Sequence, residues 1–281
     1  MIPSTLSLGY SPCPNDTFIF YALVHKKIET SGLRFREVLL DVETLNQMAC
    51  NGELDITKVS FHAFGHLRDR YCLLSSGSAL GRGCGPLIVA KPGNSIEGLR
   101  GKRIAIPGRL TTACLLLMLF EASLSENVIA MPFDRILDAV RRGNVDGGLI
   151  IHESRFTYPE YGLVELKDLG AWWEEETGLP IPLGCIIAKR SLGKGTIETI
   201  EGLIRRSIEY AFARREETKR YIKAHARELD DRVIEQHIQL YVNKYSLDLG
   251  SEGMRAVEEL LERAEKMGVP GKNRNLLRCG T

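Results

Sequence analysis

The amino-acid sequence predicts an α/β protein built from two lobes. Strand-like and helix-like segments alternate along its N-terminal half, which is the pattern of βαβ units with largely parallel sheets. At 281 residues the chain is longer than one small hydrophobic core usually serves. Two similar apolar strands that end in Ala-Lys, Leu87–Lys91 and Cys185–Lys189, bracket a domain's length of chain. We interpret them as two crossings, so the expected lobes are 1–88 with 187–281, and 89–186.

Apolar periodicity assigns the elements of the larger lobe. Apolar residues at every second position indicate strands, and apolar residues three and four apart indicate helices. Asn15 or Asp16 is expected to cap the first helix, and Asn51-Gly52 to end the second. The expected strands are 5–10, 33–40 and 55–61, and the expected helices are 17–28, 42–50 and a stretch from there to about residue 70.

The segment between the crossings shows the same alternation. Its expected strands are 86–91, 103–107, 127–133 and 145–152, with one helix opening at 108–112 and ending near Glu121 and another over 134–142. From about residue 196 onward, apolar residues such as Ile197, Ile200, Ile204 and Ile208 recur three and four apart. This spacing predicts helices that cover the larger lobe.

Composition argues against several classes of partner. The 37 basic and 36 acidic residues give a net charge of +1 without long blocks of one sign, which argues against nucleic acid and anionic membranes as partners. An acidic ligand must therefore be held by a few local groups. The chain start has no basic and apolar leader pattern, and the seven cysteines are scattered without a C-x-x-C pair. We expect a cytoplasmic protein, and the sequence does not indicate an oligomeric state.

Two α/β lobes joined by two crossings leave a cleft between them. Ligands of open α/β sheets bind beyond the carboxyl ends of the strands, and clefts between lobes are favoured pockets. The loops that directly follow strands are therefore the candidate sites, namely 11–16, 58–62, 108–112 and 152–155.

The first of these loops, Ser11–Asp16, is both stiff and polar. Pro12 and Pro14 each fix a backbone angle and lack an N–H donor. Asn15 and Asp16 can cap the helix that follows, or form a preset rim for a ligand at its start. A plain turn between strand and helix explains the loop equally well, so both interpretations stay open.

Two further loops offer hydrogen-bond donors to an anion. Thr111 and Thr112 follow a buried strand and open a helix, where free N–H groups attract a carboxylate, although a threonine that only caps its helix is common. Lys58 and Ser60 share one side of a strand end, and Ser60 is either a donor in the cleft or an ordinary serine at the sheet edge.

One histidine stands out by position. The apolar strand Val145–Ile151 delivers His152 to its carboxyl end, where an imidazole can accept a proton from a substrate; a structural histidine at a strand end is the alternative. His62 and His66 are four apart, but they lack the glutamate and third ligand of a helical zinc motif. We therefore expect no metal site.

Several of these segments together resemble the 1,4-dihydroxy-6-naphthoate synthases of the futalosine route to menaquinone. The resemblance covers nearly the whole chain, and its most specific parts are the opening loop and the segment around His152. One departure is Leu110, where some relatives have a polar residue. The matching segments are SPCPNDTFIF (11–20), DVETLN (41–46), TKVS (57–60), ALGRG (79–83), PGRLTTA (107–113), GLIIHESRFTY (148–158) and LGAWWE (169–174).

The resemblance implies a periplasmic-binding-protein-like (type II) fold with two crossover strands and an interlobe cleft. It implies a lyase that converts cyclic dehypoxanthinyl futalosine, a small molecule carrying a carboxylate, into 1,4-dihydroxy-6-naphthoate without a cofactor. It implies that His152 is the general base. It places the substrate contacts at Lys58, Val59, Ser60, Thr111, Thr112 and Ala113, beside the rim at Asn15 and Asp16.

Two other functions remain open. A solute-binding protein would share the fold, although it would need an export signal and no base in its cleft. The sibling enzyme chorismate dehydratase would also share the fold, and the Ser11–Phe20 segment argues against it.

Overall fold

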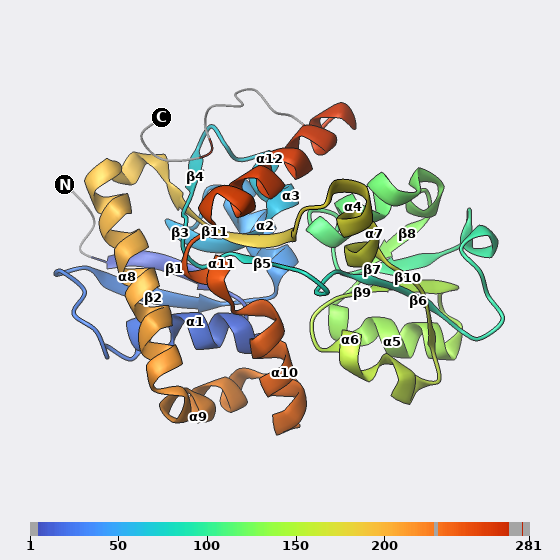
Figure 1. Cartoon of the computed structure of the whole chain (residues 1–281), viewed down its shortest axis with the longest axis horizontal. Coiled ribbons are helices and arrows are strands. Elements are labelled where there is room, and N and C mark those ends of the chain that lie inside the picture. Colours follow the sequence, from blue (N-terminus) through green and yellow to red (C-terminus); the bar gives the residue numbers. More distant parts are fainter. Residues whose placement is uncertain (1–4, 228–229, 270–276, 278–281) are drawn as a thin grey trace.

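The computed structural model describes residues 5–227, 230–269 and 277. Each of two lobes is built on one β-sheet with helices on both faces (Figure 1). The sheet of the first lobe has the order β2-β1-β3-β11-β4, with β5 also paired to β11. Its strands are β1 (Thr5–Tyr10), β2 (Arg34–Leu39), β3 (Ile56–Ser60), β4 (Tyr71–Leu73), β5 (Ala79–Gly81) and β11 (Ile181–Lys189).

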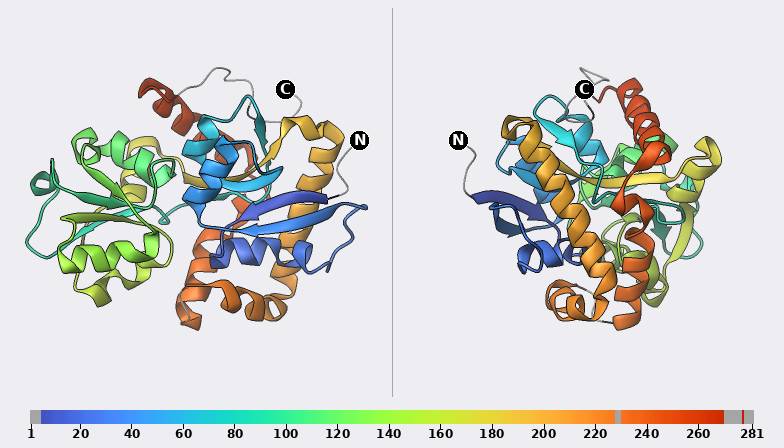
Figure 2. Two further views of the ribbon diagram at one scale, coloured as in Figure 1. Left: turned by 180° about the vertical axis from the view of Figure 1, so that it is seen from behind. Right: turned by 60° about the vertical axis from the view of Figure 1, so that its left-hand side comes forward.

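The sheet of the second lobe is made entirely from the middle of the chain. Its strand order is β10-β6-β9-β7-β8. The view from behind shows the same two lobes side by side (Figure 2). The strands are β6 (Leu87–Ala90), β7 (Ile104–Ile106), β8 (Val128–Ala130), β9 (Gly147–Ile150) and β10 (Val164–Asp168).

The expectation of largely parallel sheets is wrong for the strands that follow the crossings. β1 runs parallel to β2 and β3, and β7 runs parallel to β8 and β9. In contrast, β11 pairs antiparallel with β3, β4 and β5, and β6 pairs antiparallel with β9 and β10. The reason is topological, because a strand that arrives from the other lobe enters its sheet at the cleft edge and runs away from it. The chain passes between the lobes at residues 82–86 and 178–180.

Helices sandwich both sheets (Figure 1). One face of the first sheet is covered by α1 (Pro14–Val24), α8 (Lys194–Ala213), α9 (Arg215–His225) and α10 (Asp231–Tyr241), and the other by α2 (Val42–Cys50), α3 (Phe61–Gly65) and α12 (Gly250–Lys266), with α11 (Lys244–Leu247) between them. In the second lobe, α4 (Thr112–Phe120) and α7 (Leu169–Thr177) lie opposite α5 (Phe133–Arg142) and α6 (Ser154–Thr157). Short 3-10 helices span Glu97–Leu99, Ala122–Ser125, Tyr158–Tyr161 and Arg190–Leu192.

The first helix differs from its expected boundaries. It begins at Pro14, with Cys13 as N-cap, so Asn15 and Asp16 lie inside its first turn rather than at its cap. Proline is favoured at this position because the first helical N–H has no intrahelical acceptor. The helix also ends earlier, at Val24, and the third helix stops at Gly65 rather than near residue 70. By contrast, α2 spans 42–50 as expected.

The expected helical stripe on the C-terminal segment is confirmed. Ile197, Ile200, Ile204 and Ile208 are all buried against the first sheet and α1. Among the residues described, no helix combines the length and the apolar character needed to cross a bilayer. Five of the described cysteines are free thiols, and Cys72 on β4 is disulfide-bonded.

Candidate active site

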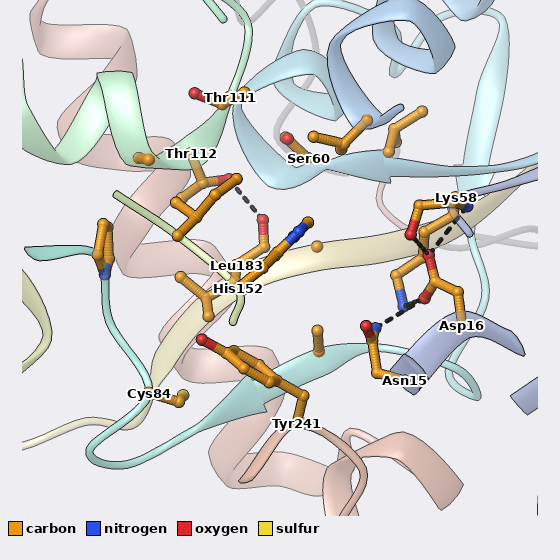
Figure 3. Close-up of a pocket in the computed structure, with 18 residues that line it drawn as sticks. Asn15, Asp16, Lys58, Ser60, Cys84, Thr111, Thr112, His152, Leu183 and Tyr241 are labelled. Atoms are coloured by element: carbon orange, nitrogen blue, oxygen red, sulfur yellow. Dashed lines mark hydrogen bonds and ion pairs between the residues drawn. The ribbon is translucent and has the colours of Figure 1, made fainter. Parts of the chain in front are cut away.

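A cleft between the lobes encloses about 650 Å³ when its open mouth is included. Clefts between lobes are common sites for small-molecule ligands. Figure 3 shows side chains from both lobes converging on it. All nine residues singled out from the sequence line it: Asn15, Asp16, Lys58, Val59, Ser60, Thr111, Thr112, Ala113 and His152.

His152 occupies a special backbone position at the floor of the cleft. It follows β9 with a φ of 56°, which places a non-glycine residue in the left-handed region. Such strain persists only where the surroundings hold it, and it concentrates at functional sites. Nδ1 of the imidazole lies 3.1 Å from Sγ of Cys13, and the Phe133 ring packs edge-on against the imidazole.

The His152 imidazole is neutral at physiological pH. Burial lowers its pKa from 6.5 to about 4, because a low-dielectric environment disfavours the charged ring. The charge of Asp16 opposes this shift, and the charge of Lys58 adds to it. A neutral imidazole with a lone pair is able to accept a proton from a bound molecule.

Lys58 and Asp16 form a buried ion pair rather than two separate ligand groups. The ammonium Nζ lies 3.1 Å from Oδ1 of Asp16 and donates to the backbone carbonyl of Gly77 at 2.6 Å. Asp16 also accepts a hydrogen bond from the Ser11 hydroxyl at 2.7 Å. The positive charge at this end of the cleft is therefore largely compensated inside the protein.

Ser60 is oriented by an asparagine that the sequence reasoning did not single out. The Asn46 carboxamide donates to Oγ of Ser60 at 3.3 Å, and its Oδ1 accepts the Ser60 backbone N–H at 2.9 Å. Because the Ser60 oxygen acts as acceptor here, its O–H remains available to the cleft. The only sequence signal for this role was that Asn46 ends the segment DVETLN.

The two threonines use their hydroxyls inside the protein. Thr111 is the N-cap of α4, so its oxygen accepts the N–H of Cys114 while its O–H donates to the Gly108 carbonyl. The Thr112 hydroxyl donates to the carbonyl of Leu183 on β11 at 2.6 Å and so links the two lobes. What this loop offers a ligand is the backbone N–H groups of Thr112 and Ala113, which have no intrahelical acceptor.

A buried polar cluster behind the cleft was not anticipated from the sequence. His237 on α10 is fully buried, and its Nε2 lies 2.9 Å from Oδ1 of Asn15. Its Nδ1 faces Oε2 of Glu153 at 3.8 Å. Tyr241, one turn further along α10, lines the cleft itself. His237 and Tyr241 lie 85 and 89 positions beyond His152 in the chain, and no sequence pattern indicated this proximity.

Cys13, His152 and Glu153 are the one group, among the residues described, with donor atoms spaced as metal ligands can be, all within 4.8 Å of one another. Burial raises the pKa of the Cys13 thiol well above its usual range, which keeps the sulfur protonated. The sulfur already makes a hydrogen bond with His152. Cys13 and His152 therefore form a hydrogen-bonded pair, with Glu153 beside it.

Comparisons with known proteins agree on one relationship. The model of a family described as "Menaquinone biosynthesis" matches residues 6–266. A curated protein of Thermus thermophilus named 1,4-dihydroxy-6-naphtoate synthase is 54% identical over 94% of this chain and 95% of its own length. One of the same name from Streptomyces coelicolor is 44% identical over 96% of each chain.

Solved structures share the fold. A protein from Archaeoglobus fulgidus is 39% identical with a TM-score of 0.89, covering 96% of this chain and 100% of that one. The alkanesulfonate-binding protein of Xanthomonas axonopodis pv. citri, solved with bound MOPS, is 14% identical with a TM-score of 0.73, covering 99% of this chain and 97% of that one. The second likeness shows the periplasmic-binding-protein fold alone.

Proposed function

Since the chain belongs to the menaquinone biosynthesis family, we propose that it catalyses the step for which its curated relatives are named, the formation of 1,4-dihydroxy-6-naphthoate. It is an enzyme of menaquinone biosynthesis. The finer proposal is that it acts as a lyase on cyclic dehypoxanthinyl futalosine, releasing the naphthoate and a small sugar-derived fragment. The observation that carries this proposal is the neutral imidazole of His152, held at the floor of the cleft in a strained backbone conformation.

In the proposed reaction His152 removes a proton from the bound substrate. Ring opening and cleavage of a carbon–carbon bond follow, and formation of the aromatic naphthoate supplies much of the driving force. The imidazole requires no prior deprotonation, because it is already neutral near pH 7. A positioned base of this kind typically contributes a factor of about 10²–10⁴ in rate.

The substrate carboxylate is proposed to bind at the start of α4. The N–H groups of Thr112 and Ala113 point out of the first helical turn, where the helix dipole favours negative charge. The Ser60 O–H supplies a further donor, because Asn46 holds its oxygen as an acceptor. This arrangement suits a cleft whose lysine is already paired with Asp16.

The test is to incubate the wild-type protein and His152→Asn with cyclic dehypoxanthinyl futalosine and to follow the naphthoate by chromatography and mass. We expect product from the wild type and a loss of about 10²–10⁴ in kcat for the variant. Equal turnover by both proteins would show that a residue other than His152 is the base. Turnover of chorismate instead would assign the sibling dehydratase, and binding without product from the wild type would assign a binding protein.

A further inference from the structure

A glutamate of the first lobe holds the loop that leads into α4 of the second. Glu43, in the first turn of α2, accepts the backbone N–H of Leu110, whose nitrogen lies 3.2 Å from Oε2 and 3.3 Å from Oε1. The Gln47 side chain and the backbone of Arg109 also interact with this carboxylate. Glu43 does not line the cleft, although its neighbour Val42 does. The carboxylate therefore joins the two lobes beside the cleft without facing a ligand in it.

The same contact explains why residue 108 is a glycine. A Cβ on Gly108 would lie 2.3 Å from Oε2 and 2.4 Å from Cδ of Glu43, closer than nonbonded atoms approach. Gly108 is not among the glycines with a positive φ, so its backbone conformation does not itself require glycine. The missing side chain leaves room for the Glu43 carboxylate. One residue in each lobe is thus adapted to this contact.

Asn46 links Glu43 to a residue that lines the cleft. Its Oδ1 accepts the backbone N–H of Ser60 at 2.9 Å, and because an N–H can only donate, this bond fixes which end of the amide is the oxygen. The amide nitrogen of Asn46 then lies 3.3 Å from Oγ of Ser60 and 3.3 Å from Oε2 of Glu43. Asn46 is fully buried, so without Glu43 one of its two amide hydrogens would lose its acceptor. Glu43 therefore supports the orientation of Asn46 that leaves the Ser60 O–H free for a ligand.

We propose that Glu43 is a positioning residue that assembles the carboxylate site from two halves, one in each lobe. Through Leu110 it holds the start of α4, whose backbone N–H groups form one half. Through Asn46 it holds Ser60, whose O–H forms the other half. This role rests on the proposed function, because the ligand that both halves face is the carboxylate of the substrate.

Other contacts from the first lobe also hold the start of α4. The backbone N–H of His62, on α3, donates to Oγ1 of Thr112 at 3.3 Å, and Nδ1 of His62 lies 3.2 Å from the carbonyl oxygen of Thr111. The Thr112 hydroxyl donates in turn to a carbonyl of β11. These contacts persist when Glu43 is replaced. Loss of Glu43 should therefore loosen the carboxylate site rather than abolish it.

The first test is steady-state kinetics with cyclic dehypoxanthinyl futalosine. We would compare the wild type with Glu43→Ala, which removes the contact, and with Glu43→Gln, which keeps an oxygen for the N–H of Leu110. The control is Glu258→Ala, which removes an exposed glutamate from α12 and should keep both kinetic constants. We expect KM to rise about tenfold in Glu43→Ala with kcat within about threefold, and KM to stay within about threefold of the wild type in Glu43→Gln. A variant that merely unfolded in part would lose kcat and keep KM, so an unchanged KM in Glu43→Ala would overturn the proposal.

The second test measures dependence on the ligand carboxylate and needs no turnover. We would titrate the proteins, without oxygen, with 1,4-dihydroxy-6-naphthoate and with 1,4-dihydroxynaphthalene, which lacks the carboxylate. Glu43→Ala should bind the naphthoate about tenfold more weakly than the wild type and should bind the naphthalene within about twofold of it. An equal loss for both compounds would show that Glu43 does not act on the carboxylate site and would contradict the proposal.

The third test asks whether Gly108 and Glu43 act through one contact. Gly108→Ala places a methyl group against the Glu43 carboxylate and should raise KM, whereas in Gly108→Ala/Glu43→Ala the methyl group has room and KM should match that of Glu43→Ala alone. Effects on KM that multiply in the double variant would mean that the two positions act independently, against the proposal. A wild type that binds the naphthoate without turning over the substrate would refute the proposed function alone, and the titrations would decide the role of Glu43. A wild type that neither binds the naphthoate nor forms it would refute both.

Discussion

Sγ of Cys13 lies 3.1 Å from Nδ1 of His152. This contact joins the stiff loop at the start of the first lobe to the strand end of the second. Cys13 is 2% exposed and lies behind the imidazole, so its thiol contacts the base rather than the cleft. If Nδ1–H donates to this sulfur, Nε2 is the ring nitrogen left with a lone pair for a substrate.

Replacing Cys13 should therefore affect turnover more than binding. We expect Cys13→Ala to lower kcat about tenfold with KM little changed, because the ring loses the partner that fixes its orientation. Cys13→Ser, which restores a polar partner, should retain most of kcat. Cys114→Ala serves as the control, since that thiol is buried in α4 and does not line the cleft. Steady-state kinetics on the four proteins measures this, and an unaffected kcat in Cys13→Ala would exclude the positioning role.

On the acid side, activity should decline only at low pH. The base works when neutral, and burial lowers the pKa of His152 from 6.5 to about 4. On the acid side, kcat/KM should thus stay level from neutral pH down to about pH 5 and fall below it. A profile that declines with a midpoint near 6.5 would mean that the free enzyme holds His152 in a more polar setting than the structure indicates.

A second buried histidine should make folding stability depend on pH. Burial, with a further contribution from His66, lowers the pKa of His62 to about 4, so between pH 4 and 6.5 the unfolded chain binds a proton that the native state does not. The contribution of His62 to the free energy of unfolding should therefore be complete above pH 6.5. It should decrease as pH falls toward 4, by up to about 3 kcal/mol. Denaturant titrations of His62→Asn should show a weaker pH dependence than those of the wild type, and an unchanged dependence would contradict this assignment.

Replacing only one member of the Lys58–Asp16 pair should lower the stability of the fold substantially. Both side chains are almost fully buried, at 6% and 3% exposure. Lys58→Met leaves the Asp16 carboxylate buried without its cation, and we expect a loss of about 3–5 kcal/mol in unfolding free energy. The double variant Lys58→Met/Asp16→Asn should regain much of that loss. If the two single losses simply added in the double variant, the pair would not be coupled.

A close backbone contact at the first crossing should not tolerate a side chain. A Cβ on Gly85 would lie 2.3 Å from the backbone nitrogen and Cα of Gly170 at the start of α7. We expect Gly85→Ala to destabilise the protein by about 2–3 kcal/mol, because backbone cannot move aside as a flexible side chain can. Gly202→Ala is the control, since that glycine is exposed on α8 with open space around it, and its replacement should stabilise by about 0.5–1 kcal/mol. Thermal unfolding of both variants distinguishes these outcomes.

Local patterns predicted much of the secondary structure. Strands such as β1 and β2, and helices such as α2 and α4, lie where apolar periodicity predicted them. This is because the spacing of apolar residues and the capping residues can both be recognised within a short, contiguous stretch of sequence. Direction within the sheets was predicted less well. β6 pairs antiparallel with β9, and β11 pairs antiparallel with β3. These directions depend on where the chain re-enters each sheet, and no short stretch of sequence contains that information.

The sequence by itself indicated loops that line the cleft, among them those of Asp16, Thr111 and His152, because ligand sites of α/β lobes follow the carboxyl ends of strands. Tyr241 lines the cleft as well, and no sequence pattern indicated it. Only the tertiary structure decided how these residues are paired. It joined Lys58 to Asp16, turned the threonine hydroxyls inward, and brought His237 of α10 against Glu153 and Asn15. The physical reason is that hydrogen bonds and pKa values depend on distances between segments far apart in the chain, and folding sets those distances.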